Sequence, residues 1–396
     1  ARPEHWVYAL VSLQTQEGFL GAGNYGVSRM NGGFASRPGL GVAPRGGPGR
    51  RLVRDAERLA DLRARLLDDY AMYRDSGGNA LVWLLPWNGN APLHPKSLDV
   101  LYIDICRRVR MLHSPTGQLT AYGTTTASAR VDAKALKGNT GDPWTPLMPD
   151  AGGYKALTVD RGSFGYKRLV PLLLGGGDES PRRALLQLVA PTDDAIGLRV
   201  VARGLVRGQG QTDGLLEREI PISRSLRSLL VERPTDRDAA VALERVEDAS
   251  TFARRVLFPA ILQVYTGAPR EGERARDDDT AKKRTNRVLA VFDHRIDQSF
   301  FADLSAELDV ANDVDAARAI RAHWLLRLKA MGHLLVSRTA SSAPSAAMRS
   351  FRVRARALDV LAHAFQRQFG QRVTDALPGR SASMPDVHPR SANAAP

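Results

Sequence analysis

Hydrophobic positions in the first quarter of the chain predict two amphipathic helices separated by a Gly-rich segment. Apolar side chains recur at helical spacing from Trp6 to Leu13, and again from Leu52 to Tyr73 with Arg and Asp residues between them. The stretch from Gly18 to Arg51 holds so many Gly and Pro residues that it cannot be one regular element. We therefore expect a long loop there, and a long loop inside a compact protein is usually functional or disordered.

The middle of the chain has shorter hydrophobic runs. NALVWLLPW predicts a buried strand or a short piece of core. LDVLYIDICRRVRMLH, from Leu98 to His113, predicts a further amphipathic helix that ends at the turn-like sequence SPTGQ. From Leu119 to Pro221, short apolar runs alternate with Gly, Pro and Asp, which is typical of a mixed sheet with long loops.

The pattern changes after about Arg233, where turn residues become rare and long helical periods begin. Four helices are predicted, at Asp238–Tyr265, Thr285–Leu308, Val314–Ser337 and Ala346–Phe369. Consecutive helices with short connections favour an antiparallel bundle. The residues after Leu377 are rich in Pro, Ser and Ala and are predicted to be disordered. The expected fold class is α+β: a mixed α/β body with long Gly-rich loops (1–232), a C-terminal four-helix bundle (233–377) and a disordered tail (378–396).

The charge balance indicates the kind of partner. The chain has 56 Lys and Arg residues against 42 Asp and Glu residues, which gives a formal net charge of +14. A surplus of this size favours a polyanion such as nucleic acid, and Arg pairs well with phosphates and base edges. A bias of composition or a need for solubility is the alternative explanation of the surplus.

A single cysteine, Cys106, excludes disulfide frameworks and zinc sites built from several thiolates, and it indicates a reducing cytoplasm. It lies in an apolar stretch, which favours a buried and inert thiol. No run of about 18 apolar residues and no basic-then-apolar leader occurs, so we expect a cytoplasmic location. The chain starts within a helical pattern and without an initiator Met, so we also expect a natural segment before Ala1.

Recognisable catalytic and metal-binding patterns do not occur in the sequence, which favours a binding protein over an enzyme. The eight His residues are scattered, and neither an HExxH motif nor a GxSxG elbow is present. GAGNYG, from Gly21 to Gly26, matches the letters of a dinucleotide fingerprint, but a helix rather than a strand is predicted before it. A nucleotide-dependent enzyme using this loop is an alternative, and no catalytic residue, metal ligand or cofactor is assigned.

The Gly-rich segment also suits a nucleic-acid contact made by the backbone. Closely spaced glycines such as Gly21 and Gly23 let the main chain approach a groove floor, while Asn24, Arg29 and Asn31 supply donors. Such a ribbon fits the minor groove, where proteins use Arg, Asn and main-chain contacts. A purely structural Gly-rich turn is the alternative.

Two further loops carry similar chemistry. VRGQGQTDGLLER places Gln209 and Gln211 next to glycines, where an amide either wedges into a base step or lies solvated at a hairpin tip. KALKGNTGDPWTP holds Lys134 and Lys137, which are candidate contacts to a groove or to phosphates.

The order and spacing of three motifs resemble the CasA family, the large subunit of the type I-E CRISPR surveillance complex Cascade. The motifs are ALVSLQTQEGFLGAGNYGVSRMNGGFASRP, KALKGNTGDPWTP and ARGLVRGQGQTDGLLEREIPI, and the predicted bundle follows them. The resemblance covers nearly the whole chain apart from its tail. It implies a mixed α/β body, a C-terminal four-helix bundle and an N-terminal segment that is absent before Ala1.

The resemblance also implies a function. CasA is a non-catalytic, DNA-binding subunit that recognises the short motif flanking the target, the PAM, from the minor-groove side. The family's Gly-rich loop corresponds to Leu20 through Gly26 here, with Gly21 and Gly23 nearest the groove, and its lysine contact corresponds to Lys134 or Lys137.

The family's glutamine wedge, which starts strand separation, corresponds to Gln211 as first choice and Gln209 as second, although Gly210 stands where some relatives have an amide residue. The implied partners are target double-stranded DNA with its displaced strand, the guide-RNA-containing backbone and small subunits of Cascade, and the trans-acting helicase-nuclease. A basic scaffold that binds only proteins is the remaining alternative.

Overall fold

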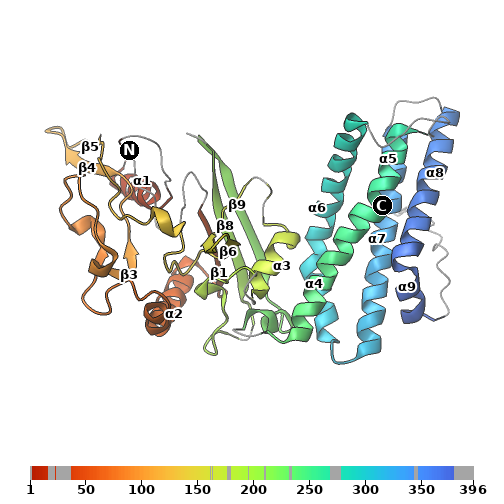
Figure 1. Cartoon of the computed structure of the whole chain (residues 1–396), viewed down its shortest axis with the longest axis horizontal. Coiled ribbons are helices and arrows are strands. Elements are labelled where there is room, and N and C mark those ends of the chain that lie inside the picture. The colour runs from red at the N-terminus through yellow and green to blue at the C-terminus, as the bar shows by residue number, and fades with distance from the viewer. Residues whose placement is uncertain are drawn as a thin grey trace, which may run out of the picture. The chain divides into compact units, whose positions relative to one another are not determined.

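The computed structural model describes residues 2–16, 23, 37–160, 162, 164–175, 180–194, 196–208, 211–231, 234–267, 278–342 and 347–378. The chain divides into two compact units, Ala1–Ala239 and Ala240–Pro396. Figure 1 shows strands, helices and long connections in the first unit and long helices in the second. The α+β fold class expected from the sequence is confirmed.

Among its described residues, unit 1 wholly contains three α-helices and nine short strands. The helices are α1 (Pro3–Gln16), α2 (Pro48–Asp69) and α3 (Tyr166–Leu174). The strands are β1 (Arg37–Ala43), β2 (Asn79–Leu81), β3 (Leu98–Ile103), β4 (Arg108–His113), β5 (Leu119–Thr124), β6 (Leu147–Asp150), β7 (Gly153–Ala156), β8 (Arg199–Gly208) and β9 (Gln211–Pro221). The predicted helices over 6–13 and 52–73 are therefore present as α1 and α2.

The strands form one three-stranded sheet and three two-stranded sheets. β1, β8 and β9 lie in that order, and both of their pairings are antiparallel. β4–β5 and β6–β7 are antiparallel hairpins, whereas β2 and β3 pair in parallel. Because these sheets are small, the loops of unit 1 are held mainly by hydrogen bonds to other loops and to strand edges.

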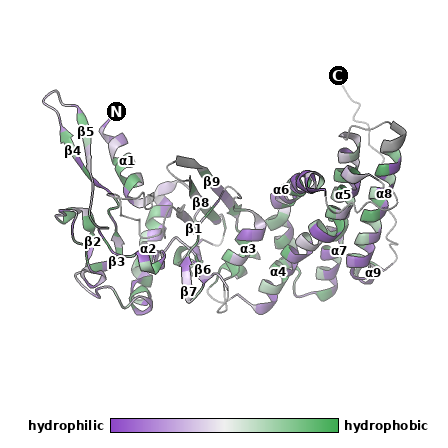
Figure 2. Ribbon diagram, turned by 45° about the horizontal axis from the view of Figure 1, so that its top comes forward, coloured by the Kyte–Doolittle hydropathy of each residue, from purple (hydrophilic) through white to green (hydrophobic). Residues whose placement is uncertain are grey.

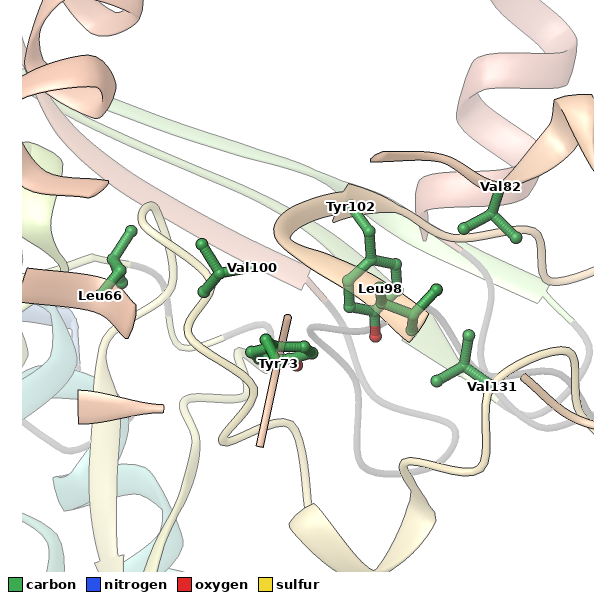
Figure 3. Close-up of a cluster of buried hydrophobic side chains, with 7 residues drawn as sticks. All are labelled: Leu66, Tyr73, Val82, Leu98, Val100, Tyr102 and Val131. Atoms are coloured by element: carbon green, nitrogen blue, oxygen red, sulfur yellow. The ribbon is translucent and has the colours of Figure 1, made fainter. Parts of the chain in front are cut away.

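One hydrophobic cluster fastens α2 to β3. Figure 3 shows its buried side chains, which come from α2, β3 and the connections around them: Leu66, Tyr73, Val82, Leu98, Val100, Tyr102 and Val131. Alternate residues of β3 are buried, as expected for a strand with one face on a core. The Tyr73 hydroxyl donates a hydrogen bond to the Thr140 carbonyl at 2.9 Å, so the cluster also reaches the loop that carries the candidate lysines.

The helix predicted over Leu98–His113 is wrong, because these residues form β3 and β4. The stretch is rich in β-branched residues, and its apolar positions satisfy a period of two as well as a helical period. Between the strands, the Asp104 carboxylate accepts a hydrogen bond from the Ile105 backbone N–H at 2.7 Å. The sequence NALVWLLPW is also only partly core, since Val82 is buried but Trp83 and Leu84 are exposed.

Unit 2 is a bundle of long helices, and the four predicted from the sequence are all present in its described part. The first runs through α4 (Asp236–Thr251), a π-helical turn (Phe252–Leu257) and α5 (Phe258–Thr266). The second is α6 (Asp279–Asp309), and the third is α7 (Val314–Ser342). The fourth runs through α8 (Ala347–Phe365), a π-helical turn (Gln366–Gly370) and α9 (Gln371–Ala376).

The interior of the bundle holds an aromatic cluster. The Phe252 ring stacks on Phe292 with 5.2 Å between centroids, and Phe365 and Phe369 lie 5.5 Å apart beside it. Both π-helical turns contribute to this cluster, through Phe252 and Phe369. Figure 2 shows hydrophobic and hydrophilic positions mixed along each bundle helix, which is typical of helices with one buried face.

A buried ionic network ties the bundle together. Glu307 of α6 accepts hydrogen bonds from Arg245 Nε at 3.0 Å and from Arg321 Nε at 2.8 Å. Arg321 also donates to Asp248 at 2.9 Å, and Arg372 of α9 donates to the same carboxylate at 2.6 Å. The network therefore joins α4, α6, α7 and α9. Among the described helices, none has the length and hydropathy to cross a membrane.

Candidate nucleic-acid interface

Between residues 17 and 36, which hold the Gly-rich loop, Gly23 is the one described residue, and its position requires glycine. Its φ is +80°, and a Cβ built there would lie 2.9 Å from Thr125 Cγ2. Its carbonyl accepts a hydrogen bond from the Thr126 N–H at 2.9 Å. The loop is therefore fastened just beyond the end of β5. The other candidates of this loop, Gly21, Asn24, Arg29 and Asn31, lie outside the described residues.

The chain that leads into this loop is fastened at the end of α1. The Gln14 amide accepts hydrogen bonds from the backbone N–H groups of Cys106 and Arg107 at 2.6 and 2.8 Å, and it donates to the Arg107 carbonyl at 2.8 Å. The Cys106 thiol is buried and donates to the Gln14 carbonyl at 2.9 Å, which confirms the buried thiol expected from the sequence. Both α1 and Gly23 are thus attached next to the β4–β5 hairpin.

The chain that leaves the Gly-rich loop enters the three-stranded sheet beside the glutamine hairpin. Arg37, the first residue of β1, pairs with Leu205 of β8. β8 continues to Gly208, which pairs with Gln211. β8 and β9 therefore form a hairpin at the end of the sheet where β1 begins. The Gln211 backbone is in β9, whereas its side chain and the whole of Gln209 lie outside the described residues. The sequence motifs around Arg37 and Gln211, far apart along the chain, therefore lie towards the same end of one sheet, with β8 between them.

The third loop, residues 134–146, docks on the opposite edge of β1. The Leu40 N–H donates to the Trp144 carbonyl at 2.7 Å, and the Thr145 hydroxyl donates to the Pro38 carbonyl at 2.9 Å. Trp144 is half-buried, and its Nε1 lies 3.4 Å from an Asp55 carboxylate oxygen. β1 thus has the glutamine hairpin on one side and the lysine loop on the other.

The two candidate lysines differ in their surroundings. Lys134 is exposed in a 3₁₀ turn, and its carbonyl accepts the Lys137 N–H at 3.2 Å. Lys137 has a left-handed backbone with φ 50° and ψ 34°, and it is the only described non-glycine residue with positive φ. Its Nζ lies 2.6 Å from Asp150 of the β6–β7 hairpin.

Asp150 holds a second cation that the sequence did not single out. Lys155 Nζ lies 2.8 Å from the other carboxylate oxygen of Asp150. Hydrogen bonds from Lys137 and then from Lys155 lower the pKa of Asp150 from 3.8 to about 2. Asp150 therefore carries a full negative charge at neutral pH. Neither Asp150 nor Lys155 stands in a recognisable motif; the hairpin register and the bond from the Ala156 N–H to the Lys137 carbonyl bring them to Lys137.

Within the described part of the chain, no cluster of His, Cys, Asp and Glu has the arrangement of a metal site. The candidate groups that the sequence assigns to the loops beside β1 are main-chain groups, amides and ammonium groups. Those are the groups with which proteins contact nucleic-acid backbones and groove edges.

The described elements define a class of protein in which a body of small sheets and long loops is combined with a bundle of long helices. Solved structures show that this is the fold of CasA, also called Cse1. Thermobifida fusca Cse1 matches with a TM-score of 0.60 and 16% identity over 93% of this chain and 70% of that chain. Thermus thermophilus CasA matches with a TM-score of 0.53 and 14% identity over 91% of this chain and 70% of that chain.

A further structure of Thermus thermophilus CasA (Cse1) matches with a TM-score of 0.52 and 11% identity, over 83% of this chain and 64% of that chain. No protein-family model matches the sequence, and no curated protein matches it. At these identities the likeness establishes the fold. The resemblance to CasA inferred from three sequence motifs is confirmed at that level.

Proposed function

We propose that this chain is the large subunit of a type I-E Cascade complex. In this proposal it recognises the PAM in double-stranded target DNA from the minor groove and wedges the duplex open, so that guide-RNA pairing can begin. The observation that carries the proposal is the CasA fold, which extends over 91 to 93% of this chain in two of the structures compared.

The proposed mechanism does not require the protein to make or break covalent bonds. Guide-RNA pairing reads the target sequence, while the protein reads a short flanking motif and opens the first base pairs. Opening costs a few kcal/mol for each unstacked base step, and contacts to the opened duplex offset that cost. We therefore assign the protein no enzymatic activity of its own and place its action in the cytoplasm.

The arrangement around β1 supports the three proposed DNA contacts. Gly23 has the left-handed backbone of a glycine turn, and its carbonyl bond to the Thr126 N–H holds the Gly-rich loop beside the end of β5. Gln211 opens the strand next to the one that pairs with β1, and Lys137 belongs to the loop docked on the other edge of β1. In the proposal Gly21 and Gly23 approach the groove, with Asn24, Arg29 and Asn31 as donors near them. Lys134 or Lys137 contacts the groove or a phosphate, and Gln211 or Gln209 is the wedge.

The partners follow from the same proposal. They are the target duplex and its displaced strand, the guide-RNA-loaded backbone and small subunits, and the trans-acting helicase-nuclease. The net charge of +14 favours the first of these. The nucleotide-enzyme alternative has no support in the local fold, because the element before the GAGNYG loop is the helix α1 and a dinucleotide fingerprint follows a strand.

The test is strand opening by a guide-loaded complex reconstituted with this chain. A fluorescent base is placed in the first target base pairs, in duplexes with and without the flanking motif. The variant carries Gln209→Ala and Gln211→Ala, and the matched control is Gln118→Ala, an exposed glutamine in the β4–β5 turn.

We expect wild type and the Gln118 control to open only the duplex with the motif, while the double variant binds weakly and opens neither duplex. Normal opening by the double variant would remove the wedge assignment. A wild-type chain that does not join the guide-loaded complex would remove the proposed function itself.

A further inference from the structure

The carboxylate of Asp150 brings two lysines from different segments to one point on the surface. Lys137 Nζ lies 2.6 Å from Oδ2 and Lys155 Nζ lies 2.8 Å from Oδ1. The lysine side chains are 54% and 49% exposed, whereas that of Asp150 is 19% exposed. The ammonium groups thus face solvent while the carboxylate lies beneath them, and the three residues together carry one positive charge.

The backbone fixes the same arrangement independently of the side chains. The Lys137 carbonyl accepts a hydrogen bond from the Ala156 N–H at 2.9 Å, next to Lys155 in β7. Asp150 pairs with Gly153 across the β6–β7 turn, where Gly152 has a φ of +82°. Loop and hairpin are therefore joined at the point where the two lysines meet.

Lys137 adopts this position in a strained conformation. A left-handed backbone is unfavourable for a residue with a Cβ, and the next residue, Gly138, is also left-handed at φ 80°. An exposed ion pair contributes little to stability, so the pair with Asp150 is a weak reason to keep a lysine in that conformation. Lys137 ends the 3₁₀ turn in this conformation, and backbone strain at an exposed cation is a feature that functional positions share.

We propose that Lys155 is a second phosphate-contacting residue beside Lys137, and that Asp150 positions both ammonium groups for one stretch of DNA backbone. The inference rests on the proposed function, because it adds a contact to the same DNA interface. An ammonium group has three donors, so each lysine keeps two after its bond to Asp150. Two such groups on the two oxygens of one carboxylate provide paired donors for the oxygens of a phosphodiester.

The test measures binding of the full chain to a fluorescein-labelled duplex over a series of salt concentrations. The variants are Lys155→Ala, Lys155→Arg and Asp150→Asn. The matched control is Lys96→Ala, an exposed lysine in a short 3₁₀ turn (Pro95–Ser97), so that each alanine variant loses one charge. Thermal melts of every variant show whether the fold is kept.

Loss of one phosphate contact reduces the slope of log K against log salt concentration by about 0.9. We expect that reduction for Lys155→Ala, a slope near wild type for Lys96→Ala, and restoration by Lys155→Arg. If Lys155→Ala behaves as the Lys96 control does, including the case in which neither differs from wild type, Lys155 is not a contact.

The Asp150→Asn variant tests whether Asp150 positions the two lysines, separately from the effect of its negative charge on DNA affinity. Removal of a negative charge should leave non-specific affinity equal to or above that of wild type, while the guide-loaded complex should discriminate less between duplexes with and without the motif. Unchanged discrimination would overturn the role of Asp150. A slope change for Lys155→Ala in a chain that does not join the guide-loaded complex would retain the DNA contact and reject the proposed function.

Discussion

Gly23 meets two constraints at once: a left-handed backbone and a neighbour too close for any side chain. Its φ is +80°, and an added Cβ would lie 2.9 Å from Thr125 Cγ2. A non-glycine residue in such a conformation costs on the order of 1–3 kcal/mol. We therefore expect Gly23→Ala to lower the free energy of unfolding of unit 1 by at least that order, as measured by urea denaturation.

Gly117 provides the control for this substitution. Its φ is +78°, but a Cβ there meets nothing within 4 Å, so Gly117→Ala measures backbone strain alone. The Gly23 variant should be the less stable of the two, and adding Thr125→Ala should recover part of the difference. Equal losses at the two glycines would show that the contact with Thr125 contributes nothing.

The charge state of Asp150 gives a second prediction at this scale. Hydrogen bonds from Lys137 and Lys155 hold its pKa at about 2 instead of 3.8. A lowered carboxyl pKa stabilises the native state above pH 3.8, and that contribution is lost as the pH falls towards 2. Carboxyl ¹³C NMR of the Lys137→Ala, Lys155→Ala double variant should show the pKa of Asp150 shifted up towards 3.8, whereas Lys96→Ala should leave it unchanged. A pKa that stays low in the double variant would mean that another group holds it.

The sequence could predict only part of the candidate site. Lys137 stands in a motif together with Gly and Pro, so its loop was recognisable. Asp150 and Lys155 were not, because their proximity to Lys137 depends on the register of the β6–β7 hairpin and on a bond between Lys137 and Ala156. Contacts of this kind arise from tertiary structure, and local spacing does not report them.

At the scale of elements, the prediction succeeded where the hydrophobic period was long. α2 repeats one apolar face over many turns, and α6 and α7 are each far longer than any described strand. The stretch Leu98–His113 is short enough to fit both periods, and in the structure it forms two strands. The ends of the bundle helices differ from the predicted ends by a few residues, because capping contacts determine where a helix begins. At the start of α6, for example, the Asp278 side chain accepts hydrogen bonds from the N–H groups of Thr280 and Ala281.

Packing between bundle elements makes Gly332 of α7 a sensitive position. A Cβ there would lie 2.9 Å from Phe252 Cζ and 3.0 Å from Leu361 Cδ1. Alanine gains roughly 1 kcal/mol of helix propensity over glycine, but overpacking a rigid core costs about 1–3 kcal/mol. Because the Phe252 ring is held by its stack on Phe292, we expect the cost to exceed the gain and Gly332→Ala to lower the Tm of the bundle.

Gly49 of α2 is the matched control, since a Cβ there meets nothing within 4 Å. Gly49→Ala should leave the Tm unchanged or raise it. Shortening Leu361 to Val in the Gly332→Ala background should restore part of the loss. An unchanged Tm for Gly332→Ala alone would mean that α7 can move away from Phe252 at no cost.

For the whole molecule, the described contacts fall into two compact units, and each has its own means of cohesion. Unit 1 relies on small sheets and on hydrogen bonds between loops, and those loops carry the proposed DNA contacts. The bundle relies on the aromatic cluster and on the buried network around Glu307. The sequence indicated both kinds of structure, but it did not indicate that charged residues would form part of the bundle interior, because Arg and Glu on a helix normally face solvent.

That network allows the two units to be perturbed separately. Glu307 is 3% exposed and is the shared acceptor of Arg245, which is fully buried, and of Arg321, which is 6% exposed. Neutralising Glu307 while both arginines stay leaves buried positive charge unpaired, which lowers the free energy of unfolding by about 3–5 kcal/mol. Arg245→Met should cost less, because Glu307 keeps its bonds to Arg321 and an apolar side chain replaces the buried cation.

We therefore expect Glu307→Gln to destabilise the bundle strongly while unit 1 keeps its structure. Hydrogen exchange followed by mass spectrometry tests this directly: peptides from α4 to α9 should lose protection, and peptides from β1, β8 and α2 should not. The salt dependence of DNA binding that we propose for Lys137 and Lys155 should then persist in the Glu307 variant. Equal loss of protection in both units would instead show that the chain unfolds as one cooperative body, in which the bundle stabilises the loops that we propose to contact DNA.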